Sequence, residues 1–213
     1  LFTTVTNVDF DPQRLRQWLL QAGAMRDRAK RLYENACRAA GQSPEALGGP
    51  AAWIPSGDLL DLVGQGVKVG LAARKEAQGD DLTGLQELVL YGLKGTAAYA
   101  DHAHVLGKDD PKVYATFHAG LDFLARDRQT VDELLGWAMK IGELNLQVMA
   151  LLDAANTGAY GHPVPTPVRI TPVKGKAILV SGHDLKDLEE LLKQTAGTGV
   201  DVYTHGEMLP AHG

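Results

Sequence analysis

The sequence predicts a mainly α protein: an antiparallel helical bundle followed by the first β-α-β unit of a Rossmann-like α/β domain. Apolar residues recur at helical spacing over about the first 157 residues, and a strand–helix–strand pattern occupies about the last forty. A proline-rich stretch divides the two patterns. We therefore expect a helical bundle domain over 1–158, a linker over 159–175, and the truncated start of an α/β domain over 176–213.

The first helix is expected over about 12–40. Asp11 and Pro12 are a typical start, because aspartate accepts hydrogen bonds from the first free amides and proline has no N–H to leave unpaired there. Residues 41–57 contain repeated glycine and proline and are expected to form a loop. A second helix is expected over 58–78. The apolar positions of the first helix are Leu15, Trp18, Leu19, Ala22, Ala29 and Leu32.

Three longer helices are expected next, and five such helices pack best as an antiparallel bundle. One covers about 81–106, and its successor begins at Asp110-Pro111. The last begins at the capping box Thr130-Val131-Asp132-Glu133 and runs to about Asn156, with Gly158 just after its end. The helix over 81–106 is expected to bury Leu82, Leu85, Leu88, Val89 and Leu93, and its small residues Gly92, Gly95, Ala97 and Ala98 favour close approach of a neighbour.

The segment Tyr160–Pro167 is expected to be an extended linker, because its closely spaced prolines remove amide donors and exclude a helix. After it, Ala177–Ser181 and Val200–Tyr203 are typical of strands, and an amphipathic helix is expected over 184–195 between them. A right-handed crossover makes such strands parallel, so both carboxyl ends lie at one edge of the sheet. Open α/β sheets bind ligands at that edge.

His183 and Glu207 follow the two strands and are the main candidate site residues. An imidazole at the start of a helix favours the neutral form, which binds metals. A carboxylate between a glycine and apolar residues, expected to be withdrawn from bulk water, needs a cation or a partner. Each residue also has a purely structural explanation: His183 could cap the strand–helix turn, and Glu207 could form a salt bridge with a lysine or arginine.

The remaining histidines and the single cysteine are weaker candidates. His205 and His212 could support the site or be exposed, and His102 and His104 lie two apart on a helix, so their imidazoles diverge and packing or hydrogen bonding is the expected use. His118 is expected to be structural or exposed, and His162 lies in the linker. Cys37, without a cysteine or histidine nearby, is expected to be inert. The inward-facing Glu-x-x-His pairs of two-metal helical bundles do not occur in the sequence.

Composition is that of an ordinary soluble protein, with 45% apolar and 22% charged residues in 213. A net charge of −5 gives no reason to expect nucleic acid or an anionic membrane as a partner. A single cysteine excludes an intrachain disulfide framework and favours a reducing, cytoplasmic location. It also means that the sequence cannot supply the four thiolates of an ordinary iron–sulfur cluster.

Five motifs resemble the hybrid cluster protein (prismane, hydroxylamine reductase) family, and the likeness covers essentially the whole chain. The two most specific are Ile178-Leu-Val-Ser-Gly-His-Asp-Leu-Lys-Asp-Leu188 and Val202-Tyr-Thr-His-Gly-Glu-Met-Leu-Pro-Ala-His-Gly213. The others are Leu90-Tyr-Gly-Leu-Lys-Gly-Thr-Ala-Ala-Tyr99, Asp101-His-Ala-His-Val-Leu-Gly107 and Tyr160-Gly-His-Pro163.

The resemblance implies an oxidoreductase that reduces hydroxylamine to ammonia, nitric oxide to nitrous oxide, or both. It implies a cubane (4Fe–4S) or related iron–sulfur cluster that passes electrons, received from an electron-donor protein, to a hybrid iron–sulfur–oxygen cluster. One histidine, two glutamates and four cysteines, one of which can be a persulfide, hold the hybrid cluster in this family. The family's histidine corresponds to His183 and its first glutamate to Glu207, so the resemblance implies that both are iron ligands.

The sequence also departs from the family pattern. The N-terminal cysteine motif, the four cysteine ligands and the second glutamate are absent, and Cys37 matches no family ligand. We therefore expect an internal fragment that binds no hybrid cluster and has no reductase activity alone. Two alternatives remain: part of a carbon monoxide dehydrogenase-like enzyme, and a non-catalytic helical binding or scaffold domain.

Overall fold

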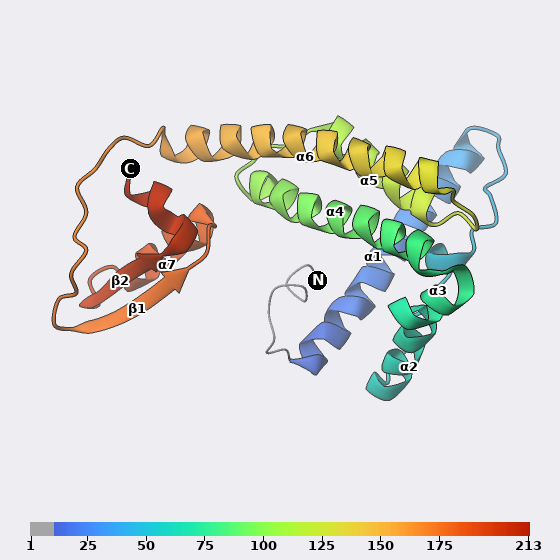
Figure 1. Cartoon of the computed structure of the whole chain (residues 1–213), viewed down its shortest axis with the longest axis horizontal. Helices are drawn as coiled ribbons and strands as arrows, with labels where there is room; N and C mark the ends of the chain where they lie inside the picture. The colour runs from blue at the N-terminus through green and yellow to red at the C-terminus, as the bar shows by residue number, and fades with distance from the viewer. Residues whose placement is uncertain (1–10) are drawn as a thin grey trace. The chain divides into compact units, whose positions relative to one another are not determined.

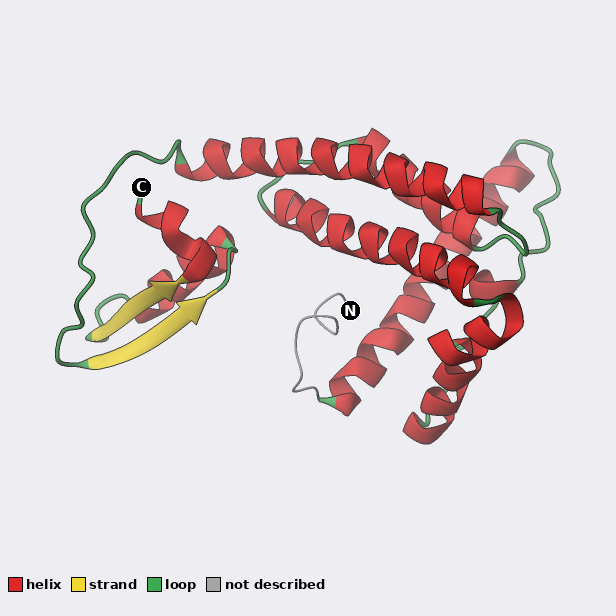
Figure 2. Cartoon of the chain, viewed as in Figure 1, coloured by secondary structure: helices red, strands yellow, loops and turns green. Residues whose placement is uncertain are grey.

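The computed structural model describes residues 11–213 and confirms a mainly helical protein with a small two-stranded parallel sheet (Figures 1 and 2). The antiparallel order of the bundle and the Rossmann-like character of the sheet remain predictions. The chain forms two compact units. The first comprises residues up to Gly95 together with 117–141, and the second comprises 96–116 together with 142–213.

The first unit begins with helix α1 (Pro12–Ala39), as expected from its start signal. Asp11 Oδ1 accepts hydrogen bonds from the amides of Gln13 (2.9 Å) and Arg14 (3.2 Å), which confirms the N-cap. The expected loop over 41–57 contains one short 3₁₀ turn, η2 (Gly49–Ala51).

The prediction of a single helix over 58–78 is wrong, because the structure has two helices there. Helix α2 (Leu59–Val69) and helix α3 (Leu71–Gln78) meet at Gly70. Gly70 has φ −70° and ψ 170°, an extended conformation that interrupts the helical hydrogen-bond ladder. A glycine has little preference for remaining helical, which makes it the natural position for this break.

Helices α4 (Asp80–Val105), α5 (Pro111–Leu124) and α6 (Val131–Tyr160) follow the expected pattern. The close approach expected at Gly92 is confirmed, because a Cβ there would lie 2.8 Å from Ile141 Cγ2. Leu88 was expected to be buried on α4, but its side chain is 57% exposed. Thr83, a polar residue, takes a fully buried position on that helix instead.

Helix α6 has the start that the sequence predicts but a different end. Thr130 N donates to Glu133 Oε2 (2.8 Å) and Glu133 N donates to Thr130 Oγ1 (3.3 Å), which confirms the capping box. Gly158 does not end the helix, which continues to Tyr160. Gly161 ends it instead, because its φ of +86° is a left-handed conformation that glycine adopts without steric cost.

The second unit contains a small helical core and the β-α-β segment. One buried cluster of this unit consists of Ala103, Leu152 and Ala155. Strands β1 (Lys176–Ser181) and β2 (Val200–His205) are parallel and are joined by helix α7 (Leu185–Thr195), and the turn η3 (Gly206–His212) follows β2. Within the described residues, no helix combines the length and the apolar character that crossing a bilayer requires.

Candidate functional site

His183 and Glu207 lie side by side because of the register of the parallel sheet. Ser181, the last residue of β1, is paired with His205, the last residue of β2. The two candidate residues each follow two positions later in the chain. Nδ1 of His183 lies 3.3 Å from Oε2 of Glu207. The strand ends therefore bring together one nitrogen donor and one oxygen donor.

A glycine with positive φ precedes each of these two residues. Gly182 has φ +149° and Gly206 has φ +67°. Both conformations favour glycine, because a Cβ would crowd the neighbouring backbone. Each glycine lets the chain turn away from its strand at once, so that the next side chain lies at the edge of the sheet.

Both side chains are accessible to solvent. The His183 side chain is 45% exposed and that of Glu207 is 78% exposed. The expectation that Glu207 is withdrawn from bulk water is therefore wrong. The reason is local: in the turn η3, the apolar Met208 takes the buried position at 2% exposure, and Glu207 extends outward beside it.

Two residues of α4 lie against His183. The ring centroid of Tyr99 is 5.8 Å from that of His183, and the ring centroid of His102 is 5.6 Å away. His104 instead meets Asp109, with Nδ1 2.8 Å from the carboxylate oxygen. The expected divergence of the two histidines is therefore confirmed. The contact of Tyr99 with the site was not foreseen, since nothing in the sequence pairs residues so far apart.

Asp184 links His102 to the start of helix α7. Its Oδ1 accepts hydrogen bonds from the amides of Lys186 (2.8 Å) and Asp187 (3.2 Å), as the N-cap of α7. Its Oδ2 lies 3.6 Å from Nε2 of His102. Neither contact of Asp184 is among the features expected from the sequence.

Charged side chains of α7 bond to one another, and one of them also bonds to Tyr160 at the end of α6. The hydroxyl of Tyr160 donates to Oε2 of Glu189 at 2.9 Å. Hydrogen bonds from Lys193, Lys186 and Tyr160 lower the pKa of Glu189 to about 2. The pKa of Lys186 is raised by its hydrogen bonds to Glu189 and Glu190. These contacts do not involve the His183–Glu207 pair.

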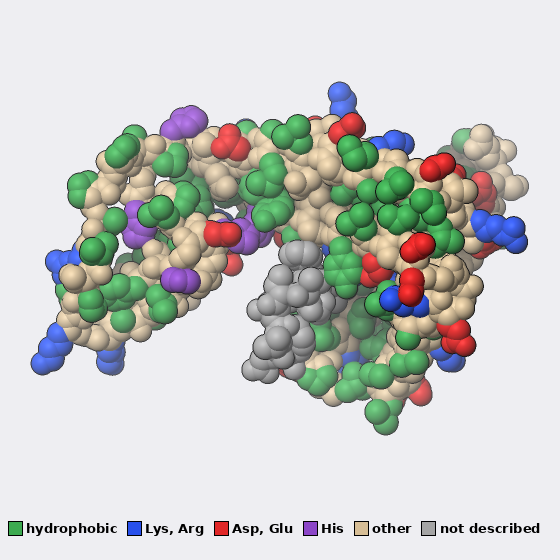
Figure 3. Space-filling view, in the orientation of Figure 1, with side chains coloured by type: hydrophobic (Ala, Val, Ile, Leu, Met, Phe, Trp, Pro, Cys, Tyr) green, Lys and Arg blue, Asp and Glu red, His purple; other side chains and the backbone are tan. Residues whose placement is uncertain are grey.

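Four further histidines have other surroundings. His205 Nδ1 is 3.0 Å from Ser181 Oγ, and His212 Nε2 is 2.6 Å from Thr204 Oγ1. His118 and His162 are exposed. Figure 3 shows histidine side chains on the surface.

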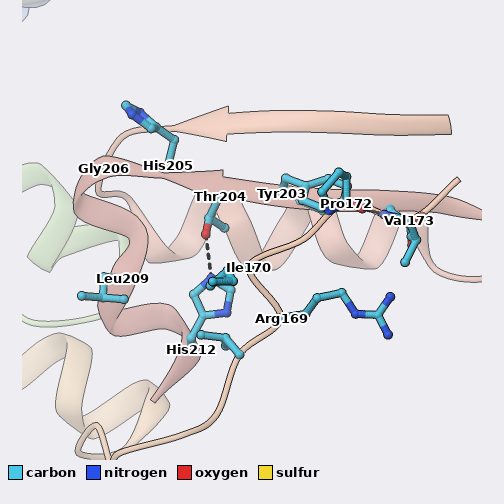
Figure 4. A pocket seen from close by; sticks show the side chains of 13 residues that line it. Arg169, Ile170, Pro172, Val173, Tyr203, Thr204, His205, Gly206, Leu209 and His212 are labelled. Carbon is cyan, nitrogen blue, oxygen red and sulfur yellow. Dashed lines mark hydrogen bonds between the residues drawn. The ribbon is translucent and has the colours of Figure 1, made fainter. Parts of the chain in front are cut away.

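A hollow of about 840 Å³ lies beside β2 and was not predicted from the sequence (Figure 4). Linker residues such as Arg169 and Ile170 form one side, and the amide of Val173 donates to the hydroxyl of Tyr203 at 2.8 Å. His205 and His212 line it. Neither His183 nor Glu207 does, so the hollow is separate from the candidate pair.

The pair fits part of a metal site but not a whole one. An imidazole nitrogen and a carboxylate oxygen this close together are donors that iron accepts. Over residues 11–213, however, no group of three or more His, Cys, Asp and Glu side chains is arranged to hold a metal ion. The pair therefore supplies two donors of the kind that metal sites use.

Comparisons with known proteins confirm the family resemblance. The model of the Prismane/CO dehydrogenase family matches residues 1–213. Proteins named hydroxylamine reductase from Rhodospirillum rubrum, Acidiphilium cryptum and Geobacter sulfurreducens are 56%, 53% and 50% identical to the chain. Each alignment covers 100% of this chain but only 39%, 38% and 39% of the relative. The chain thus spans about two fifths of the length of these curated relatives.

Proposed function

We propose, from the premise that this chain belongs to the Prismane/CO dehydrogenase family, that it is part of an iron–sulfur oxidoreductase that reduces hydroxylamine. His183 and Glu207 serve in it as two iron ligands of a hybrid iron–sulfur–oxygen cluster. The observation that carries the proposal is the 3.3 Å separation of His183 Nδ1 and Glu207 Oε2. The relatives that are 50–56% identical are named hydroxylamine reductase, which supports the choice of substrate.

The reaction takes up two electrons and two protons. With these electrons and protons, the N–O bond of hydroxylamine is cleaved and ammonia and water are released. Reduction of nitric oxide to nitrous oxide is a related reaction of the same site. The bound cluster supplies the electrons, which come from an electron-donor protein through a second iron–sulfur cluster. The part of this chain is to present a nitrogen and an oxygen donor from two adjacent strand ends, at a solvent-accessible position.

The 213-residue chain alone is not sufficient for this activity. It offers two donors at the site, and its single cysteine, Cys37, is late in α1. Iron–sulfur clusters are held mainly by cysteine thiolates. We therefore propose that the isolated chain binds no hybrid cluster. Anaerobic reconstitution that loaded it with stoichiometric iron and sulfide would contradict this.

The ligand assignment is tested in the full-length protein. We expect His183→Ala and Glu207→Gln each to lower the iron content and to abolish the hybrid cluster's electron paramagnetic resonance signal, together with hydroxylamine reduction. His118→Ala, an exposed histidine of α5, is the control and should keep both. Full iron content and an unchanged signal in either variant would show that the residue is not a ligand.

Metal analysis of the same protein separates the proposal from its alternatives. Iron without nickel is expected. Stoichiometric nickel would instead indicate a carbon monoxide dehydrogenase-like site. A folded full-length protein without any metal would favour a non-catalytic binding or scaffold role.

A further inference from the structure

The imidazole of His183 is in contact with two rings from a different part of the chain. Tyr99 and His102 are three residues apart on α4, so they share one face of that helix. Their ring centroids lie 5.8 and 5.6 Å from that of His183, with interplanar angles of 50° and 39°. These separations are in the range in which aromatic pairs attract each other.

Tyr99 is fixed in position by the core of the second unit. Its side chain packs on the buried cluster of Ala103, Leu152 and Ala155, which joins α4 to α6. Its ring also meets His102 edge-on, with centroids 6.2 Å apart and an interplanar angle of 86°. The two rings thus form a surface that is held by helix packing and not by the strand–helix turn that carries His183.

His102 makes a second, polar contact with the same turn. Its Nε2 lies 3.6 Å from Oδ2 of Asp184, whose other oxygen caps α7. The turn is therefore held at two adjacent residues, by ring contacts at His183 and by a polar contact at Asp184. An exposed side chain on a turn otherwise samples several rotamers.

We propose that Tyr99 and His102 are positioning residues that hold the imidazole of His183 in the orientation that faces Glu207. The importance of that orientation rests on the proposed function, but the holding itself does not. A ligand that is fixed before the metal arrives binds it more tightly, because no rotamer freedom remains to be lost. Neither ring is itself placed among the ligands.

The experiment measures the His183 side chain directly in the metal-free 213-residue chain. Histidine labelled with ¹³C at Cε1 gives one Hε1–Cε1 resonance for each ring, and His183→Gln identifies that of His183. In the wild type we expect a ring-current shift of this resonance, cross-relaxation with the Tyr99 ring protons, and restricted ring motion. Tyr99→Phe keeps the ring and should keep all three.

Removal of either ring should release His183. We expect Tyr99→Leu and His102→Ala to lower the ratio of held to free imidazole by roughly two- to tenfold, the factor that corresponds to one aromatic pair. His104→Ala is the matched control, because His104 lies two residues further along α4 and contacts Asp109. It should leave the His183 resonance unchanged.

Two outcomes would overturn the proposal. One is an unchanged His183 resonance in folded Tyr99→Leu and His102→Ala; the other is an equal change in His104→Ala, which would indicate general loosening of α4. Should His102→Ala unfold, His102→Gln replaces it, and unfolding of both would show that His102 is needed for the fold and not for positioning. These resonances are measured on the iron-free 213-residue chain. The result is therefore independent of whether His183→Ala loses iron in the full-length protein.

Discussion

Nδ1 of His183 lies 3.3 Å from Oε2 of Glu207, and the pairing of Ser181 with His205 is what brings them together. The register holds along six residue pairs, from Lys176 and Val200 to Ser181 and His205. A slip of one position would move one strand end past the other and separate the two donors. Such a slip would also exchange the two faces of the strand. The pair is thus a consequence of sheet pairing and not of local sequence.

The turn after β2 should depend on Gly206. Its φ of +67° is costly for any residue with a Cβ, so Gly206→Ala should destabilise the chain by about 1–2 kcal/mol. Gly142→Ala is the control: Gly142 lies inside α6 with open space around its Cα, and alanine there should stabilise by about 0.5–1 kcal/mol. Urea denaturation followed by circular dichroism measures both. Equal effects of the two substitutions would exclude a special role for the turn.

The close contact of α4 with α6 in the first unit can be tested with a double-mutant cycle. A Cβ at Gly92 would lie 2.8 Å from Ile141 Cγ2, so Gly92→Ala should cost about 1–3 kcal/mol. Ile141→Leu removes the branch at Cβ that carries Cγ2. The double variant should therefore be more stable than the sum of the two single effects predicts. Additive effects in urea denaturation would contradict the contact.

The sequence predicts those features that depend on local patterns. The start of α1 follows from Asp11, and the start of α6 follows from Thr130 and Glu133, because each cap is made within a few residues. The positions of His183 and Glu207 after their strands are predictable for the same reason, since glycine marks the end of each strand.

The features that the sequence does not predict depend on competition or on distant residues. A glycine such as Gly70 can stay inside a helix, so only the surrounding structure decides that it breaks one. Glu207 is exposed because Met208 occupies the buried position of the turn. The contact of Tyr99 with His183 requires the packing of α4, which no local pattern contains.

The charged contacts of α7 predict a dependence of stability on pH. The pKa of Glu189 is lowered from 4.5 to about 2 in the folded chain, first by its hydrogen bond to Lys193. Between these values the unfolded chain binds the proton and the folded chain does not, so the contribution is complete above about pH 4.5 and is lost as the pH falls toward 2.

Urea denaturation at several pH values tests this contribution. Glu189→Gln should make the stability less dependent on pH over that acidic range, while Glu76→Gln, on the exposed surface of α3, should leave the dependence as in the wild type. The pH profile of Glu189→Gln should then differ from the wild type only in the acidic range. Identical profiles would show that the contacts of Glu189 are too well screened by solvent to matter.

Asp184 has two contacts, and two substitutions separate them. As the N-cap of α7, it should be replaceable by asparagine at a cost of a few tenths of a kcal/mol, whereas Asp184→Ala should cost about 1 kcal/mol. Asp11 caps α1 with the same pattern, one oxygen on two amides, and is the matched control. If capping is the main role, the Asn and Ala substitutions should rank in the same order at both positions in urea denaturation. If the contact with His102 at 3.6 Å contributes as much, Asp184→Asn should lose stability where Asp11→Asn does not, and His102→Ala should remove that difference.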